Sequence, residues 1–202
     1  SSLLRHSAAG FSVLESHLAD RLSEQLVIAA GHRPSPSERR SWERSLPALV
    51  ADLIDADLGG VELLVEYQLP LTSKRADVVL AGIGARTGSA AYLIVELKQW
   101  TEATRFEDSD SLVAVPGYGH PVLHPLDQVS GYCEYLQDYN AALAEAPESV
   151  AGIAYLHNAT DLGVTDLLDR RRPGARLFTG QRRSELRAFL RSYFAPASGA
   201  AA

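Results

Sequence analysis

Cysteine and long apolar runs are nearly missing from this chain of 202 residues, and each lack excludes a class of protein. Because Cys133 is alone, no disulfide can close within the chain and no cysteine-based zinc cluster can form. We expect this thiol to be a small core side chain. No apolar stretch approaches the roughly 18 residues of a membrane span, and the first residues lack the apolar centre of a signal peptide. The sequence therefore predicts a cytoplasmic protein without a membrane segment.

Lysine is scarce as well. Only Lys74 and Lys98 are lysines among the 19 basic residues, and the others are arginines. Where a chain uses arginine almost throughout, a retained lysine suggests a task for a compact ammonium rather than a planar guanidinium. Lys98 follows Glu96 by two positions, whereas Lys74 lies in a stretch typical of an exposed turn. We therefore expect Lys98, more than Lys74, to carry chemistry.

Acidic residues outnumber basic ones, which gives a net charge of −6. This charge argues against a surface that coats nucleic acid indiscriminately, although clustered metal-binding acids would contribute to it. Local basic clusters do occur, and the plainer interpretation is a solvated helical face, which we favour over a patch that follows phosphates. The clusters comprise Arg39, Arg40 and Arg44, and then Arg170, Arg171, Arg172, Arg176, Arg182, Arg183, Arg187 and Arg191.

Apolar spacing predicts helices over residues 1–58, with a break near Ser45 because Pro47 should kink or restart the second one. Residues 61–69, 76–80 and 91–97 are rich in branched side chains and are predicted to form three strands of an antiparallel meander. Residues 112–115 indicate a small flanking strand or loop. A helix starting at Pro125 should bury one stripe of side chains, which comprises Val129, Tyr132, Leu136, Tyr139 and Leu143.

The segment 150–156 is typical of a short buried strand, and the preceding helix has the length of a crossover that would lay it parallel to an earlier strand. An edge strand at 177–179 and a final helix to residue 193 should follow, and 196–202 indicates a tail or linker. The predicted fold is α/β, with a mixed central sheet of about four to five strands flanked by helices. Residues 1–195 should form a single domain, with the meander at 61–98 and the remaining helices and strands at 124–195.

Three acids and one lysine fall on the predicted meander. Because successive strand side chains alternate between faces, Glu96 and Lys98 share one face while Val95 and Leu97 lie on the other. A strand register that joins Glu66 and Asp77 to Glu96 is feasible. Carboxylates that hold Mg²⁺ beside an ammonium suit the hydrolysis of a phosphodiester.

In this arrangement the chain resembles the PD-(D/E)XK nuclease superfamily. More narrowly, it resembles the nuclease-like domain that precedes a P-loop ATPase in bacterial helicase-like proteins. The resemblance covers nearly the whole chain, and the Asp…Glu-x-Lys element gains specificity from the helix bearing Gln128 and from longer strings. These strings are Ser41-Trp42, Ser45-Leu46-Pro47, Tyr67 to Arg75, Val95 to Trp100 and Tyr155-Leu156-His157-Asn158. One departure is Ala76, which stands where the superfamily has its name-giving proline.

The resemblance implies that Asp77 and Glu96 bind a metal ion, Mg²⁺ or Mn²⁺, with Glu66 as an additional catalytic acid and metal ligand nearby and the carbonyl of Leu97 as a further ligand. It implies that Lys98 orients or activates water, either as an ammonium or as a partly neutral base. It also implies that Gln128 orients phosphate or water. Nucleic-acid contacts are expected at Lys74, Arg75 and Tyr132, and an expected restriction-endonuclease-like α/β/α arrangement follows from the same resemblance.

Each role has a plainer alternative. Glu66 could be a surface acid of an edge strand, Gln128 could satisfy backbone groups, and Tyr132 could belong to the core. His120 and His124 are not counted as metal ligands, because the prolines after them indicate loop and helix-start positions.

The expected function is hydrolysis of DNA by a Mg²⁺- or Mn²⁺-dependent nuclease, within a larger protein that carries a P-loop ATPase or helicase domain. A catalytically silent nucleic-acid-binding module and an RNA- or tRNA-cleaving nuclease are the alternatives. This chain has no Walker-type glycine loop and no helicase motif, so we expect it either to be a fragment of a longer protein or to act alone.

Overall fold

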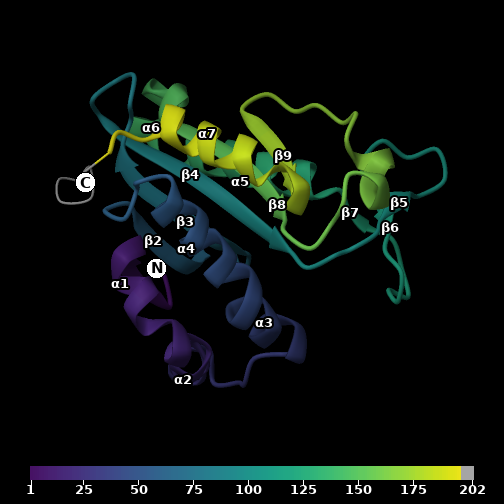
Figure 1. Cartoon of the computed structure of the whole chain (residues 1–202), viewed down its shortest axis with the longest axis horizontal. Helices are drawn as coiled ribbons and strands as arrows, with labels where there is room; N and C mark the ends of the chain where they lie inside the picture. The colour runs from purple at the N-terminus through teal and green to yellow at the C-terminus, as the bar shows by residue number, and fades with distance from the viewer. Residues whose placement is uncertain (197–202) are drawn as a thin grey trace.

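Six strands form a mixed sheet in the computed structural model, which describes residues 1–196 (Figure 1). The strand order is β1-β2-β3-β4-β8-β9; the pairs from β1 to β4 are antiparallel, and β4, β8 and β9 run parallel. The predicted α/β class, the meander and the parallel β8 are therefore confirmed. The strands are β1 (Leu4–Ser7), β2 (Glu62–Gln68), β3 (Arg75–Ile83), β4 (Ala90–Lys98), β8 (Val150–Leu156) and β9 (Ala175–Thr179).

The sheet has more strands than the four to five expected, because β1 was missed. This strand has only four residues, and two of them are Arg5 and His6, so it lacks the apolar alternation that predicts a strand. It pairs with β2 at the edge of the sheet, where Arg5 forms an ion pair with Glu62. Charged side chains on a short edge strand are a common protection against pairing with other chains.

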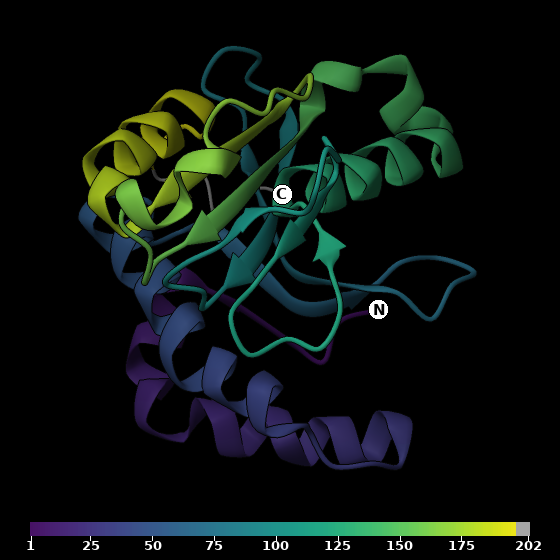
Figure 2. The same cartoon turned by 90° about the vertical axis from the view of Figure 1, so that its right-hand side faces the viewer.

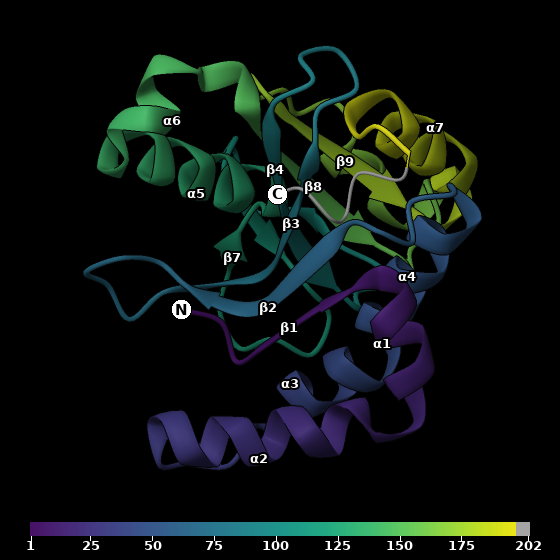
Figure 3. The same ribbon diagram turned by 90° about the vertical axis from the view of Figure 1, so that its left-hand side faces the viewer.

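One face of the sheet packs on helices from both ends of the chain (Figure 3). Phe11 of α1, Leu53 of α4 and Leu190 of α7 meet Leu63 and Val95 of the sheet in one buried cluster. The helices of this side are α1 (Ala8–Leu14), α2 (Leu18–Ala30), α3 (Pro36–Arg40), α4 (Leu46–Asp55) and α7 (Arg183–Tyr193).

The predicted N-terminal helix is split into α1 and α2 by a 3₁₀ turn. The turn lets α1 pack on α4 while α2 packs on residues 41–45. A π-helical segment, Ser41–Ser45, precedes α4 at the break that Pro47 predicted. Ser45 does not cap α4, since its hydroxyl is 2.8 Å from Nε2 of His157.

The helix α5 (Pro125–Tyr139) covers the other face over β4, β8 and β9 (Figure 3). Its residue Val129 packs with Val79, Ile94 and the buried thiol of Cys133. The predicted helix is shorter than expected, because Asn140 has an extended backbone and caps a new helix, α6 (Ala141–Glu145), by accepting a hydrogen bond from the amide of Ala142. Leu143 therefore belongs to α6.

A small antiparallel sheet of β5 (Thr104–Arg105), β6 (Leu112–Ala114) and β7 (Val122–Leu123) lies at one end of the molecule (Figure 2). Val113 packs here with Trp100, Leu156 and Val164 in a separate cluster. Residues 112–114 thus form a strand rather than a loop. The division of the chain into a single domain and the tail at 196–202 stay predictions, and residues 197–202 lie outside those that the structure describes.

Asp52 ties the helical layer to the sheet. Its carboxylate is fully buried, accepts a hydrogen bond from Tyr155 Oη at 2.6 Å, and forms ion pairs at 3.1 Å with Arg183 and Arg187. A buried charge needs such partners to offset its lost hydration. The network joins α4, β8 and α7. Within residues 1–196, no helix combines the length and apolar character that a membrane crossing requires.

His124 caps α5, and we expect it to make stability depend on pH. Its Nδ1 accepts from the amide of Leu126 at 3.0 Å, and its Nε2 is 3.2 Å from the Leu167 carbonyl. Burial lowers the pKa of His124, against the Leu167 carbonyl and Asp127, which raise it. As the pH falls, His124 binds a proton near pH 6.5 in the unfolded chain but only at a lower pH in the folded protein. The free energy of unfolding therefore decreases as the pH falls from about 6.5 through the lower folded pKa.

The variant His124→Asn keeps an acceptor for the cap and removes the imidazole. We expect it to lose about 1 kcal/mol of unfolding free energy above about pH 7, from the lost contact with Leu167. Below that pH its stability should fall less steeply than that of the wild type. Urea unfolding at several pH values measures the free energy of unfolding and its dependence on pH. The same pH dependence in the variant and the wild type would contradict the role of His124 as the titrating group.

Candidate metal-binding site

Three acids lie at matched positions on neighbouring strands. In the β2–β3 pairing Val65 is opposite Val78 and Tyr67 is opposite Ala76, which places Glu66 at the level of Asp77. In the β3–β4 pairing Val78 is opposite Val95, and the next position along places Asp77 at the level of Glu96. The register thus aligns the acids across three strands.

Two direct contacts hold Asp77, Glu96 and Lys98 in place. Lys98 Nζ is 2.9 Å from Oε1 of Glu96, and Oδ2 of Asp77 accepts a hydrogen bond of 2.7 Å from the amide of Leu97. The β3–β4 pairing ends at Val78 and Val95. Beyond this point the Asp77 side chain, rather than a backbone carbonyl of β3, accepts the hydrogen bond of the Leu97 amide. The Leu97 side chain is buried on the sheet face that packs against α1, α4 and α7. These contacts fix both carboxylates and the ammonium at the end of β4.

Burial dominates the electrostatics of the two carboxyl groups. Burial and, after it, the neighbouring Asp77 raise the pKa of Glu96 to about 8, against the effect of Lys98. Burial also raises the pKa of Asp77, while Lys98 and the Leu97 amide lower it. For Lys98, burial alone would lower the pKa, but Glu96 and Asp77 raise it above its ordinary value. Two adjacent buried carboxylates repel, and a cation between them relieves that repulsion.

One oxygen of this group lacks any partner. Glu96 is 3% exposed, and its Oε2 is buried without a hydrogen bond, the only such side-chain atom found in the part of the chain that the structure describes. Buried acceptors are nearly always satisfied, by protein, water or a bound ion. A divalent cation such as Mg²⁺ prefers carboxylate oxygens, so this atom beside Asp77 fits a metal ligand.

Glu66 is held apart from the other two acids. Its Oε1 accepts a hydrogen bond of 3.0 Å from the indole nitrogen of Trp42, and its φ is 53°, in the left-handed region that glutamate rarely adopts. Burial and, after it, the charge of Asp77 raise the pKa of Glu66 to about 7, against the hydrogen bond from Trp42. Consistent with this separation, no three His, Cys, Asp or Glu side chains within residues 1–196 converge as a metal-holding group. The candidate donors at this site are therefore Asp77 and Glu96, with the Leu97 carbonyl as a further one, and the expected metal role of Glu66 stays a prediction.

Gln128 and Tyr132 lie across from the acids on α5. The Gln128 amide donates to Oη of Tyr132 at 3.1 Å. Burial raises the pKa of Tyr132, and the charges of Glu96 and Asp77 raise it as well, against the hydrogen bond from Gln128. Tyr132 also packs against the cluster that contains Val79 and Ile94, which share the sheet face of Asp77 and Glu96. Gln128 and Tyr132 line a groove of about 420 Å³, the α5 groove, together with Leu69, Thr72, Lys74, Leu123, Asp127, Gly131 and Tyr135.

Lys74 and Arg75 lie on the opposite wall of this groove or next to it. Lys74 is exposed in the turn between β2 and β3, as its sequence context predicted, and Arg75 opens β3 opposite Gln68. Neither forms an ion pair within residues 1–196. Their charges are therefore available to a ligand of the groove.

Several neighbours of the site were not singled out from the sequence. Glu38 of α3 raises the pKa of both Glu66 and Asp77 by its charge. The ring centroid of Trp100 lies 5.4 Å from Lys98 Nζ, and the indole nitrogen donates a hydrogen bond of 3.1 Å to the hydroxyl of Tyr118. Trp42 and Trp100 occur in the strings that carry the family resemblance, but no local signal gave them a role.

The C-terminal arginines are largely used inside the protein. Five of them form ion pairs with acids: Arg170 and Arg172 with Asp127, Arg182 with Asp161, and Arg183 and Arg187 with Asp52. Arg176 instead lies over the ring of Phe189. The plainer interpretation, a solvated helical face, fits only in part, because most of these arginines bind acids of other elements of the fold.

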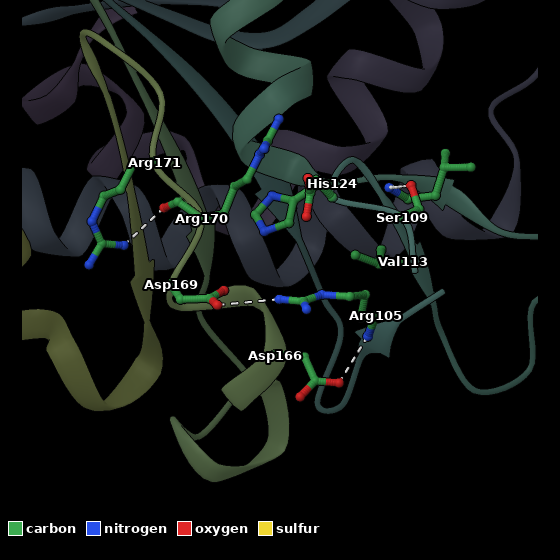
Figure 4. A pocket seen from close by; sticks show the side chains of 10 residues that line it. Arg105, Ser109, Val113, His124, Asp166, Asp169, Arg170 and Arg171 are labelled. Atoms are coloured by element: carbon green, nitrogen blue, oxygen red, sulfur yellow. Dashed lines mark hydrogen bonds and ion pairs between the residues drawn. The ribbon is translucent and has the colours of Figure 1, made fainter. Parts of the chain in front are cut away.

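A hollow of about 190 Å³ between β5, β6 and residues 166–171 is a separate feature (Figure 4). Its charges are matched within it. Arg105 binds Asp169 through its guanidinium at 3.3 Å and Asp166 through its amide at 3.0 Å, and Arg171 donates to backbone carbonyls. We therefore attribute this hollow to the packing of the small sheet.

No family model matches the chain, and no similar protein was found among curated proteins or solved structures.

Proposed function

We propose that this protein is a Mg²⁺- or Mn²⁺-dependent nuclease that hydrolyses DNA. The observation that carries the proposal is the unpartnered Oε2 of Glu96, buried beside Asp77 and 2 residues before the ammonium that binds the other oxygen of the same carboxylate. An apolar core does not need this group, and its burial is costly. Such costs are typical of sites kept for chemistry.

Asp77 and Glu96 are the residues that would hold the ion, with the carbonyl of Leu97 as a third donor. When bound, the ion would neutralise charge that develops on the phosphate during hydrolysis. Glu66 would stay with Trp42 and act on the site through its charge, as a neighbour of Asp77.

Lys98 serves as an ammonium in this proposal. Its ion pair with Glu96 aims it at the site, where its remaining protons can hold the attacking water or a phosphate oxygen. The neutral-base alternative is less favoured, because two carboxylates stabilise the charged form. Gln128 would orient phosphate or water from α5, through an amide that already touches Tyr132.

The same features support membership of the PD-(D/E)XK superfamily and a restriction-endonuclease-like α/β/α arrangement. They are the acids on β3 and β4, the lysine two residues after Glu96, and the glutamine helix across the sheet. A cytoplasmic location and a P-loop ATPase or helicase domain in the same protein belong to this proposal.

A catalytically silent nucleic-acid-binding module is the second candidate. The observation that favours it is the hydrogen bond from Trp42 to Glu66, which holds one carboxylate away from a metal ion. Binding alone, however, does not require two buried acids that repel phosphate.

Incubation of the purified protein with labelled single-stranded, duplex and structured DNA tests the proposal. We expect cleavage with Mn²⁺ or Mg²⁺ and none with a chelator. A protein that binds DNA but leaves every substrate intact in both metals would support the silent module instead. The same assay with RNA tests whether the protein cleaves ribonucleic acid as well as DNA.

A further inference from the structure

Three tyrosines form a stripe on the helix that faces the candidate site. Tyr132, Tyr135 and Tyr139 follow each other at three- and four-residue intervals on α5, so they share one helix face. The rise of a helix spreads them over roughly 10 Å. The rings of Tyr135 and Tyr139 are parallel within 6°, with centroids 6.2 Å apart, and Tyr139 is 50% exposed.

The stripe connects two hollows. Tyr132 and Tyr135 line the α5 groove, and Tyr139 lines a hollow of about 720 Å³ between α5, α6 and the open face of β2 to β4. The hollows are neighbours along α5: Leu69 lines the first, Pro70 lines the second, and the hydrogen bond from Tyr135 to the Pro70 carbonyl lies at the boundary between them. The tyrosine stripe therefore runs from the α5 groove across this boundary to the larger hollow.

The charges of the α5 groove suit an anionic chain, whereas the larger hollow is lined by Glu148 and by Arg5, which pairs with Glu62. Lys74 is exposed in the wall opposite Tyr132 and Tyr135, without an ion pair within residues 1–196. The acid in the groove, Asp127, is neutralised by Arg170 at 2.6 Å and by Arg172 at 3.4 Å. Positive charge thus remains on the open wall, while the aromatic stripe forms the other.

Exposed aromatic rings beside a cation are how proteins grip unpaired bases and the backbone that joins them. Bases of a duplex are stacked on one another and cannot lie on these rings. We propose that the DNA substrate is a single strand, which runs from the acids along α5 with its bases on Tyr132, Tyr135 and Tyr139. This inference rests on the proposed function for the position of cleavage, but the strand path can be tested without cleavage.

The experiment measures binding of a fluorescein-labelled oligothymidylate, and of a duplex of equal length, by fluorescence anisotropy with EDTA present to prevent hydrolysis. We expect the wild type to bind the single strand more tightly than the duplex. Tyr139→Ala should weaken single-strand binding by about 5- to 100-fold, the loss expected when one stacked base is released. Tyr139→Phe keeps the ring and should bind within about twofold of the wild type.

Ile28→Ala is the control, because Ile28 is equally a large exposed side chain but lies on α2 away from the groove. It should leave binding unchanged. The inference is overturned if Tyr139→Ala binds the single strand as tightly as the wild type, or if the duplex binds as tightly as the single strand. Cleavage without a Tyr139 effect would remove only this inference, whereas Tyr139-dependent binding without cleavage would remove only the nuclease activity.

Discussion

Replacing Lys98 with alanine is expected to reduce metal-dependent DNA cleavage by at least about 100-fold, the usual effect of removing a group that stabilises transition-state charge. Lys98 is the cation nearest the two buried carboxylates, with its Nζ 2.9 Å from Glu96. We expect the fold to survive, because Glu96 can take up a proton once its partner is gone; burial and Asp77 already raise its pKa to about 8. The measurement is the single-turnover cleavage rate at saturating enzyme.

The matched control for this variant is Arg105→Ala, which removes a basic side chain from an exposed ion pair in the separate hollow of Figure 4. It should retain the wild-type rate. Lys98→Arg tests geometry, because a guanidinium is planar and larger, and we expect it to stay well below the wild type. A Lys98→Ala protein that folds and cleaves at the wild-type rate would refute the catalytic role of Lys98.

Replacing Glu96 with glutamine is expected to weaken Mn²⁺ binding by at least about tenfold, or about 1.4 kcal/mol. Glutamine has nearly the same shape but loses the charge that a hard cation requires. Asp77→Asn should act in the same direction, and its side-chain oxygen can still accept the amide of Leu97. Isothermal titration calorimetry measures the affinities.

Thermal unfolding separates a lost ligand from a lost fold. Metal that binds only the folded protein raises its melting temperature, so Mn²⁺ should stabilise the wild type more than Glu96→Gln. Without metal, the variant should be about as stable as the wild type, since a buried charge is costly. Glu43→Gln, in an exposed pair with Arg39, is the control and should keep wild-type affinity. Equal Mn²⁺ affinity in Glu96→Gln, Asp77→Asn and the wild type would contradict the ligand assignment.

The meander and the acids on it could be predicted because both depend on short-range patterns. Strand alternation alone puts Glu96 and Lys98 on one face, and the turns between the strands restrict the register that aligns Asp77 with Glu96. The buried strand β8 was predictable because an apolar run after a helix of crossover length has few other places to go.

Other features depend on contacts that no local pattern reveals. The bond from Trp42 to Glu66 spans 24 residues of sequence and accompanies a left-handed backbone at Glu66. In the sequence, Trp42 is one more apolar position of a helix. The arginines of the C-terminal region find their acids at Asp52, Asp127 and Asp161 only after folding. Composition could therefore indicate a basic cluster but not its use.

The tyrosine stripe was predictable only in part. Helical spacing placed Tyr132 and Tyr139 in a buried stripe, yet Tyr139 is half exposed because α5 ends there and leaves part of the sheet face open. Exposure depends on which elements cover a helix, and this is decided by the tertiary structure.

The most direct test of the metal centre is a crystal soaked in Mn²⁺, with anomalous diffraction recorded above the manganese edge. The proposal predicts an anomalous peak in contact with Glu96 Oε2 and with the Asp77 carboxylate. A peak elsewhere, or a well-ordered Glu96 whose Oε2 is satisfied by a protein group without any peak, would contradict it.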